Sequence, residues 1–195
     1  MKELWNKRYA QTEFVYGTEP NEFFKQQLLK LTPGKILLPA EGEGRNAVFA
    51  AKAGWEVYAF DSSIEAKKKA EKLAKENNVR INYQLSPYEE ADYLNSFFDA
   101  IAFIYAHSTT RSANHKKMIQ LLKPNGTIIL EGFSKKQIYN TSGGPKSIDM
   151  LFSKEELLSD FNSCTDLKIW EEDFELNESL RHSGKASVIR LIGRK

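Results

Sequence analysis

Short apolar runs alternate with longer amphipathic stretches along most of the chain. Runs of strand length lie at residues 36–38, 56–60, 79–85, 97–106 and 127–130. The stretches between them carry apolar residues at helical spacing, and we expect helices near residues 46–53, 63–78 and 114–122. The sequence Lys123-Pro124-Asn125-Gly126 predicts a turn before the last of these strands. Strands that alternate with helices in this way form βαβ units, so we expect an open sheet with helices on both faces.

The C-terminal part of the chain has a different pattern. Residues 152–161 are expected to form a helix, because Ser153 and Glu156 have the spacing of a capping box. Two apolar runs at 167–176 and 186–192 then flank a polar loop at 177–184, which predicts an antiparallel pair of strands. The fold class is therefore α/β, doubly wound and mostly parallel, with an antiparallel pair at the end.

Composition narrows the possible functions without identifying one. A length of 195 residues without internal repeats predicts a single domain. Its 28 basic and 26 acidic residues are interspersed, which gives no sign of a nucleic-acid partner. No apolar run approaches the ~20 residues of a membrane span, and a single cysteine favours a reducing compartment, so we expect a cytoplasmic protein. His115 and His182 have no neighbouring metal-ligand residues, and we expect no metal site.

The ends of the first two strands carry the candidate chemistry, because ligands of open α/β sheets bind beside the carboxyl ends of the strands. After the first strand, Gly42 and Gly44 allow a sharp turn, and Asn46 begins a helix with free backbone N–H groups. Asp61 ends the second strand 17 residues after Gly44 (61 − 44), close to the ~20-residue spacing at which a carboxylate accepts hydrogen bonds from a ribose. Together these residues favour a nucleoside-containing cofactor. The alternatives are a plain turn for the glycines and a helix cap for Asp61.

The acidic residues of the same loop help to choose the cofactor. Glu41 and Glu43 would repel a pyrophosphate, whereas carboxylates suit the ammonium group of an amino acid. This favours S-adenosyl-L-methionine over NAD. Two alternatives remain, an NAD-dependent oxidoreductase and a protein that binds S-adenosylmethionine without catalysis.

The string from Ile36 to Asp61, with the later strand and turn motifs, resembles class I S-adenosylmethionine-dependent methyltransferases. More narrowly, the chain resembles the small tellurite-resistance (TehB-like) branch of that class at Trp5–Tyr9, Tyr16-Gly17, Glu41–Asn46, Glu131–Phe133 and Tyr139–Lys146. The resemblance implies a Rossmann-like, seven-stranded sheet whose last strand is antiparallel. It also implies one methyltransferase domain over residues 1–195, in which residues 1–20 cover the cofactor site.

The resemblance also assigns cofactor-binding roles by position. Those at the methionine end fall on the loop after the first strand, at Glu41, Gly42, Glu43, Gly44 and Asn46. Asp61 would hold the ribose, Ser62 and Ser86 would flank the adenine, and Tyr105 would close the pocket beside the sulfonium. The chain departs from the usual motif at Leu38, where an acidic residue is expected, at Ala40, where a glycine is expected, and near Ser86, which often has an acidic neighbour.

On the acceptor side the sequence offers candidates of lower specificity. Methyl transfer from a sulfonium is an in-line displacement, and a good nucleophile such as a thiolate or a chalcogen oxyanion needs no base. Tyr105 and His107 are the catalytic candidates, and Glu131 and Tyr139 are the substrate candidates. The alternatives are a surface histidine on a loop for His107 and a helix-cap or loop hydrogen bond for Glu131. The glycines at 143 and 144 suggest a lid. We expect a small-molecule acceptor and either a monomer or a homodimer.

Overall fold

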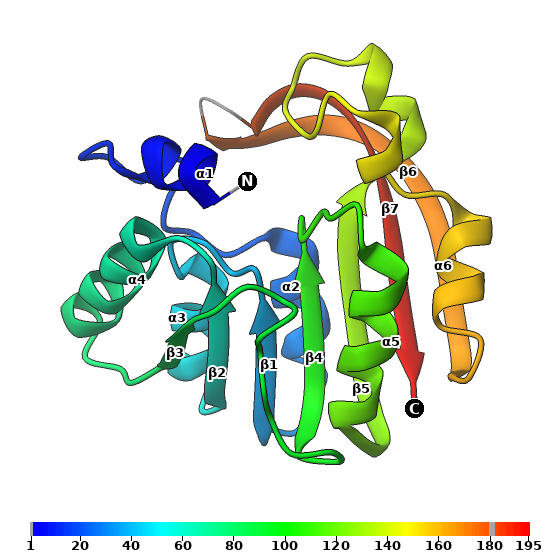
Figure 1. The fold of residues 1–195 in the computed structure, drawn as a ribbon, viewed down its shortest axis with the longest axis horizontal. Helices are drawn as coiled ribbons and strands as arrows, with labels where there is room; N and C mark the ends of the chain where they lie inside the picture. The colour runs from blue at the N-terminus through cyan, green and yellow to red at the C-terminus, as the bar shows by residue number, and fades with distance from the viewer. Residues whose placement is uncertain (1, 180–181) are drawn as a thin grey trace.

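A single mixed sheet forms the centre of the computed structural model, which describes residues 2–179 and 182–195 (Figure 1). Its seven strands have the order β3-β2-β1-β4-β5-β7-β6. The strands are β1 (Lys35–Pro39), β2 (Glu56–Asp61), β3 (Asn82–Leu85), β4 (Phe98–Ile104), β5 (Leu122–Phe133), β6 (Thr165–Ser179) and β7 (His182–Arg194). Neighbouring strands from β3 to β5 pair in parallel, whereas β7 runs antiparallel to both β5 and β6. The predicted fold class is therefore confirmed.

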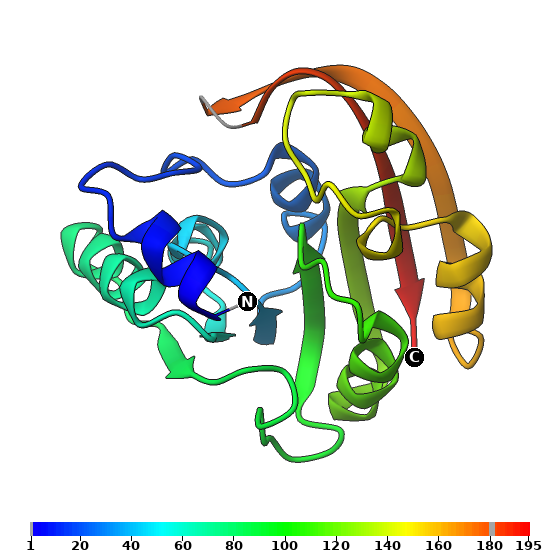
Figure 2. The same cartoon turned by 45° about the horizontal axis from the view of Figure 1, so that its top comes forward.

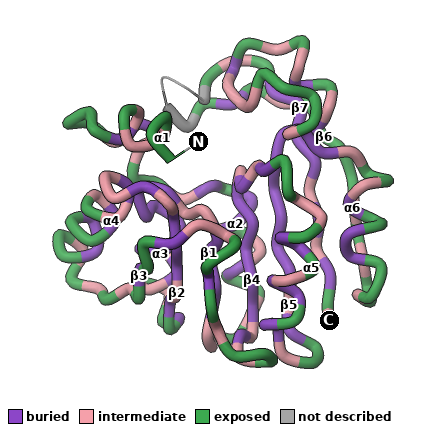
Figure 3. Tube along the Cα trace, viewed as in Figure 1, coloured by how far each residue is buried: buried purple, intermediate pink, exposed green. Residues whose placement is uncertain are grey.

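Helices cover both faces of the sheet. They are α1 (Lys2–Tyr9), α2 (Glu22–Leu28), α3 (Arg45–Lys52), α4 (Ile64–Glu76), α5 (Arg111–Leu121) and α6 (Lys154–Asp160), with short 3₁₀ turns η1 (Lys135–Tyr139) and η2 (Ile148–Met150). Along β1, Ile36 and Leu38 pack toward α2 and α3, whereas Leu37 packs into the cluster that contains residues of α5 and α6. This alternation follows from the two-residue period of a strand. The central strands are consequently buried on both sides (Figure 3).

The boundaries of several elements differ from the sequence predictions by a few residues. The strand expected from residue 79 begins only at Asn82. The turn expected at 123–126 lies within β5, where Leu122 pairs with Phe98 and Thr127 pairs with Ala100. Five residue steps along β5 therefore lie opposite two steps along β4, so the intervening residues of β5 bulge out of the ladder.

The C-terminal hairpin also differs in length from the prediction. Both strands extend into the polar loop expected at 177–184, with Asn177 opposite Ser183, and the remainder of that loop, residues 180 and 181, lies outside the described residues. A strand ladder needs backbone partners rather than apolar side chains, so polar composition did not end the pairing here. The expected capping box at Ser153 and Glu156 is confirmed at the start of α6.

Segments from the two ends of the chain both lie above the carboxyl ends of the parallel strands. Figures 1 and 2 show the distal part of the β6–β7 hairpin arching over this edge toward α1. The N-terminal segment and the distal part of the hairpin therefore lie on the side of the molecule where the parallel strands end. Over residues 2–179 and 182–195, none of the helices has the length and apolar character needed to cross a membrane.

Candidate functional site

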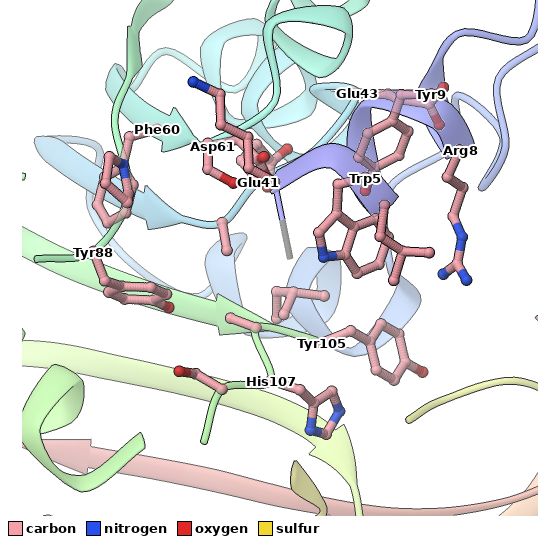
Figure 4. Close-up of a pocket in the computed structure, with 18 of the residues that line it drawn as sticks. Trp5, Arg8, Tyr9, Glu41, Glu43, Phe60, Asp61, Tyr88, Tyr105 and His107 are labelled. Atoms are coloured by element: carbon pink, nitrogen blue, oxygen red, sulfur yellow. The ribbon is translucent and has the colours of Figure 1, made fainter. Parts of the chain in front are cut away.

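A cavity of about 880 Å³ lies at the carboxyl ends of β1, β2, β3 and β4 (Figure 4). Its walls come from the strand ends, from α1 and from the segment between η1 and η2. The residues that line the cavity from the strand ends and the N-terminal segment include Trp5, Arg8, Tyr9, Glu41, Glu43, Asn46, Phe60, Asp61, Ser62, Ser86, Tyr88, Tyr105 and His107. Most of the residues predicted from the sequence are therefore brought to one place.

Asp61, the last residue of β2, joins the loops that follow β1 and β2. Its Oδ2 accepts the Gly42 N–H at 3.1 Å, and its Oδ1 accepts the Ser63 N–H at 2.9 Å. Burial raises the pKa of Asp61 to about 6, although these backbone bonds favour the ionised form. The helix cap of α4 is Ser63 rather than Asp61, because the Ser63 hydroxyl accepts the Ala66 N–H. Asp61 thus offers a carboxylate to the cavity while holding both loops.

The Glu41 side chain caps the N-terminus of α3, because the N-cap residue itself is a glycine. Gly44 occupies that position with a φ of +89° and no side chain, while Glu41 Oε1 accepts the N–H groups of Asn46 and Ala47 at 2.9 and 2.8 Å. Burial raises the pKa of Glu41 to about 7, and Arg45 acts in the opposite direction. The cavity therefore contains a second carboxyl group that ionises near neutral pH.

Glu43 has a different role from the one that its position in the loop suggests. Its Oε1 lies 2.7 Å from Lys69 Nζ, and its Oε2 accepts the N–H groups of Val15 and Tyr16 at 2.8 and 3.3 Å. The carboxylate is compensated by a lysine and ties the N-terminal segment to the loop. The acidic lining thus depends on Glu41 and Asp61 more than on Glu43.

The two glycines of the loop contribute shape rather than lining. Gly42 has a φ of +66°, and a Cβ there would lie 2.8 Å from the Tyr9 hydroxyl. A Cβ on Gly44 would lie 2.6 Å from the Ala70 Cβ, so this glycine lets α3 and α4 approach closely. Ala40 also has a positive φ, 51°, at the position where the family motif has glycine. Leu38, where the family motif has an acidic residue, is wholly buried in the core and does not line the cavity. The cavity-lining acidic residue nearest to Leu38 in sequence is Glu41.

Helix α1 is attached beside the loops that carry these carboxyl groups. Asn6 Oδ1 accepts the Ser63 hydroxyl at 2.7 Å and the Ile64 N–H at 3.1 Å, which fastens α1 to the start of α4. Trp5 stacks on the buried Tyr9 with ring centroids 5.3 Å apart. One side of α1 therefore forms a wall of the cavity (Figure 4).

The end of the cavity beside β2 and β3 is aromatic. Ser62 and Ser86, which were expected to flank the adenine, line the cavity, and the Ser86 hydroxyl donates to the Pro87 carbonyl at 2.9 Å. Phe60 and Tyr88 meet edge to face with ring centroids 5.2 Å apart. The sequence prediction did not name Tyr88, although the rule that ligands lie beside strand ends points to the residues after β3.

Tyr105 and His107 follow β4 on the other side of the cavity. Tyr105 has a φ of +53° and stacks on Phe133, with ring centroids 4.7 Å apart. His107 Nε2 accepts the Phe133 N–H at 3.1 Å, which places the proton on Nδ1, where it is donated to the Met150 carbonyl at 2.7 Å. Both ring nitrogens are engaged by the backbone, and this geometry favours a bracing role over proton transfer.

This bracing role predicts a loss of stability when His107 is removed. His107→Ala leaves the Phe133 N–H and the Met150 carbonyl without these partners, so we expect a loss of about 2 kcal/mol and a melting temperature lower by roughly 4–8 °C. Thermal unfolding followed by circular dichroism measures the effect. An unchanged melting temperature would contradict the assignment.

The structure does not bring the two substrate candidates into the cavity lining. Glu131 is buried, with Oε1 accepting from Asn21 Nδ2 and Oε2 accepting from Arg190 Nε, each at 2.6 Å. Tyr139 is 89 % exposed at the end of η1. The adjoining segment does line the cavity, through Gly144, Pro145 and Lys146. Among the residues that the structure describes, no cluster of His, Cys, Asp and Glu side chains is arranged to hold a metal ion.

Comparison with known proteins agrees with this architecture. Residues 36–126 match the family model of a methyltransferase domain. A protein studied in the conversion of a disulfide bond into a thioacetal group during echinomycin biosynthesis has a TM-score of 0.78 at 14 % identity, over 100 % of this chain and 92 % of its own. TehB from Haemophilus influenzae has a TM-score of 0.73 at 17 % identity, over 100 % of this chain and 66 % of its own.

A third solved structure has a similar fold. An S-adenosylmethionine-dependent methyltransferase from Methanosarcina mazei has a TM-score of 0.70 at 16 % identity, over 91 % of this chain and 98 % of its own. None of the curated proteins matches the sequence. The fold is that of the class I methyltransferases. The match to the methyltransferase family model implies S-adenosyl-L-methionine as the cofactor.

Proposed function

We propose that this protein transfers a methyl group from S-adenosylmethionine to a small thiolate or oxyanion acceptor by in-line displacement. The observation that carries the proposal is the cavity at the strand ends, where Asp61 and Glu41 lie together on one side and aromatic rings lie at one end. We further propose that the chain acts as one methyltransferase domain, with residues 1–20 covering the cofactor, in a reducing compartment such as the cytoplasm.

The residues present fit the ribose, the adenine and the ammonium group of the cofactor. Asp61 would accept hydrogen bonds from the ribose hydroxyls, and Phe60 and Tyr88 would pack beside the adenine. Glu41, with Asn46, would receive the ammonium of the methionine part, where opposite charges attract. The bound cofactor supplies an electrophilic methyl group on a sulfonium. The protein then has to align the acceptor and exclude water.

The cavity also has room for a small acceptor. A volume of about 880 Å³ lies toward the upper end of the ~300–1,000 Å³ usual for small-molecule sites. The side beside α1 and the segment between η1 and η2 carries three cations, Lys2, Arg8 and Lys146, together with Trp5 and Tyr105. These charges favour an anionic acceptor. An anion such as a thiolate is already a good nucleophile, so its methylation needs no general base.

One finer proposal depends on resemblance rather than on this charge pattern. A role in tellurite resistance is supported by the likeness in fold to TehB and by the motifs shared with that branch. An NAD-dependent oxidoreductase is disfavoured by the family-model match and by the two carboxyl groups in the loop, which would repel a pyrophosphate.

The cationic side of the cavity gives a kinetic prediction. Arg8→Gln and Lys146→Gln should each raise the KM for an anionic acceptor about threefold to tenfold, since one partly screened charge contributes about 1 kcal/mol. The affinity for the cofactor should stay within about twofold. Lys7→Gln is the matched control, because Lys7 is an exposed cation on the same helix that does not line the cavity. Equal KM values for all three variants would contradict an anionic acceptor.

The experiment that tests the proposed function is a panel of acceptors. Small thiols, selenite and tellurite, each with S-adenosylmethionine, would be assayed for release of S-adenosylhomocysteine. We expect turnover with at least one anionic acceptor. Tight cofactor binding without turnover across the panel would instead favour a binding protein.

A further inference from the structure

A chain of polar groups leads from β7 and β5 to the loop between β1 and α3, which is called the cofactor loop below. Arg190 on β7 donates from Nε to Glu131 Oε2 on β5 at 2.6 Å. Glu131 Oε1 accepts from Asn21 Nδ2 at 2.6 Å, and the Asn21 backbone N–H donates to Asn46 Oδ1 at 2.9 Å. Four residues from different elements are thus connected in one path.

The groups at the centre of this path are almost completely excluded from solvent. Asn21, Asn46 and Glu131 are 2 %, 3 % and 1 % exposed. The Arg190 guanidinium lies over the rings of Phe23 and Phe174, at 4.8 and 5.3 Å from their centroids. Buried charges are costly unless they are paired, so each bond in the path holds its partner in a defined orientation.

The path ends on the residues of the cofactor loop. Asn46 Oδ1 is occupied by Asn21, so the Asn46 amide turns its Nδ2 toward Glu41 Oε2, at 3.4 Å. The Asn46 backbone N–H also donates to Glu41. The orientation of one amide therefore connects the buried path to a carboxyl group that lines the cavity.

We propose that Glu131 and Arg190 are positioning residues for cofactor binding. They hold Asn21, Asn21 sets the orientation of Asn46, and Asn46 in turn directs the Glu41 carboxylate. The inference rests on the proposed function in taking Glu41 and Asn46 as part of the cofactor site. It assigns to Glu131 a role behind the cavity in place of the acceptor-binding role that its place at the strand end suggests.

The test measures binding of S-adenosylhomocysteine by calorimetry at a temperature where every variant is folded. Glu131→Gln keeps only one acceptor oxygen for two donors, and we expect it to raise the dissociation constant about tenfold. Asn21→Ser keeps the cap that accepts the Phe24 N–H but loses the Nδ2 donor, and it should have a similar effect. This second variant tests the same path if Glu131→Gln does not fold.

Two controls separate positioning from general loss of stability. Glu172→Gln removes the exposed partner of Arg190 and leaves the bond to Glu131 in place. Asp160→Asn disrupts another buried ion pair, that with Arg111, which lies between α5 and α6. Both controls should bind the ligand with an affinity within about twofold of the wild type, although Asp160→Asn should unfold at a lower temperature.

A double-mutant cycle gives the decisive comparison. If Glu131 acts through Asn46, Glu131→Gln should add less than about twofold to the dissociation constant in an Asn46→Ala background. Additive effects, or single variants that bind as the controls do, would overturn the inference. Absence of binding by the wild-type protein would instead refute the proposed function.

Discussion

Asp61→Ala should raise the dissociation constant for S-adenosylmethionine by about 100-fold or more. Each hydrogen bond from a ribose hydroxyl to a carboxylate contributes about 1.5–3 kcal/mol, and two such bonds would be lost. The same carboxylate accepts the N–H groups of Gly42 and Ser63, so the loops after β1 and β2 would also lose their common anchor. The effect combines a lost ligand contact with a less ordered site. Calorimetric titration of the folded variant measures it.

Asp99 provides the matched control for this substitution. It also accepts a backbone N–H, that of Lys35, and it lies near the start of β4, at the opposite end of the sheet. Asp99→Ala should lower the melting temperature and leave cofactor affinity unchanged. If Asp61→Ala bound the cofactor within a few-fold of the wild type, the ribose assignment would be wrong.

Cofactor affinity should increase with pH between 6 and 8, because the pKa of Glu41 is raised to about 7 by burial. The cofactor's ammonium favours the ionised carboxylate, so binding below pH 7 must release a proton from Glu41. The dissociation constant should therefore fall about tenfold from pH 6 to pH 8, with a further factor of about two from Asp61. S-adenosylhomocysteine is the suitable probe, because no sulfonium charge influences the titration of its amine.

The variants of the two loop glutamates separate the sources of this dependence. Glu41→Gln should reduce the pH effect to the factor of about two that Asp61 contributes. Glu43→Gln should retain the full dependence, because Lys69 and two backbone N–H groups already take up the Glu43 carboxylate. A tenfold pH effect that persisted in Glu41→Gln would contradict the placement of Glu41 beside the ammonium.

Stability of the ligand-free protein should respond to pH in the opposite direction. The folded-state pKa of Glu41 lies above its ordinary value of 4.5, so the folded protein binds more protons than the unfolded chain between pH 4.5 and 7. Its contribution to stability therefore declines as pH rises through that window. The melting temperature of Glu41→Gln relative to the wild type should increase from pH 4.5 to pH 8.

The sequence predicted the fold well because local pattern and tertiary position agree in the centre of the sheet. The apolar run at 97–106 indicated a strand, and β4 is a strand of the sheet that is almost entirely buried. The limits of the hairpin could not be predicted, since the pairing of Asn177 with Ser183 depends on backbone bonds that polar residues make equally well.

The site was predictable in its location and less so in its contacts. The strand-end rule placed Asp61 and Glu41 at one edge, and both line the cavity. The partners of Glu43 could not be inferred, because Lys69 lies on a helix 26 residues later and Val15 lies 28 residues earlier. Long-range pairing of this kind leaves no local spacing signal. Glu131 similarly resembled a ligand group because its partners, Asn21 and Arg190, are distant in sequence.

Isothermal titration calorimetry with S-adenosylmethionine, and with NAD titrated in parallel, tests whether this protein binds the methyl donor. We expect saturable binding of one S-adenosylmethionine per chain at neutral pH, and no binding of NAD. Absence of S-adenosylmethionine binding at millimolar concentration, or preferential binding of NAD, would contradict it.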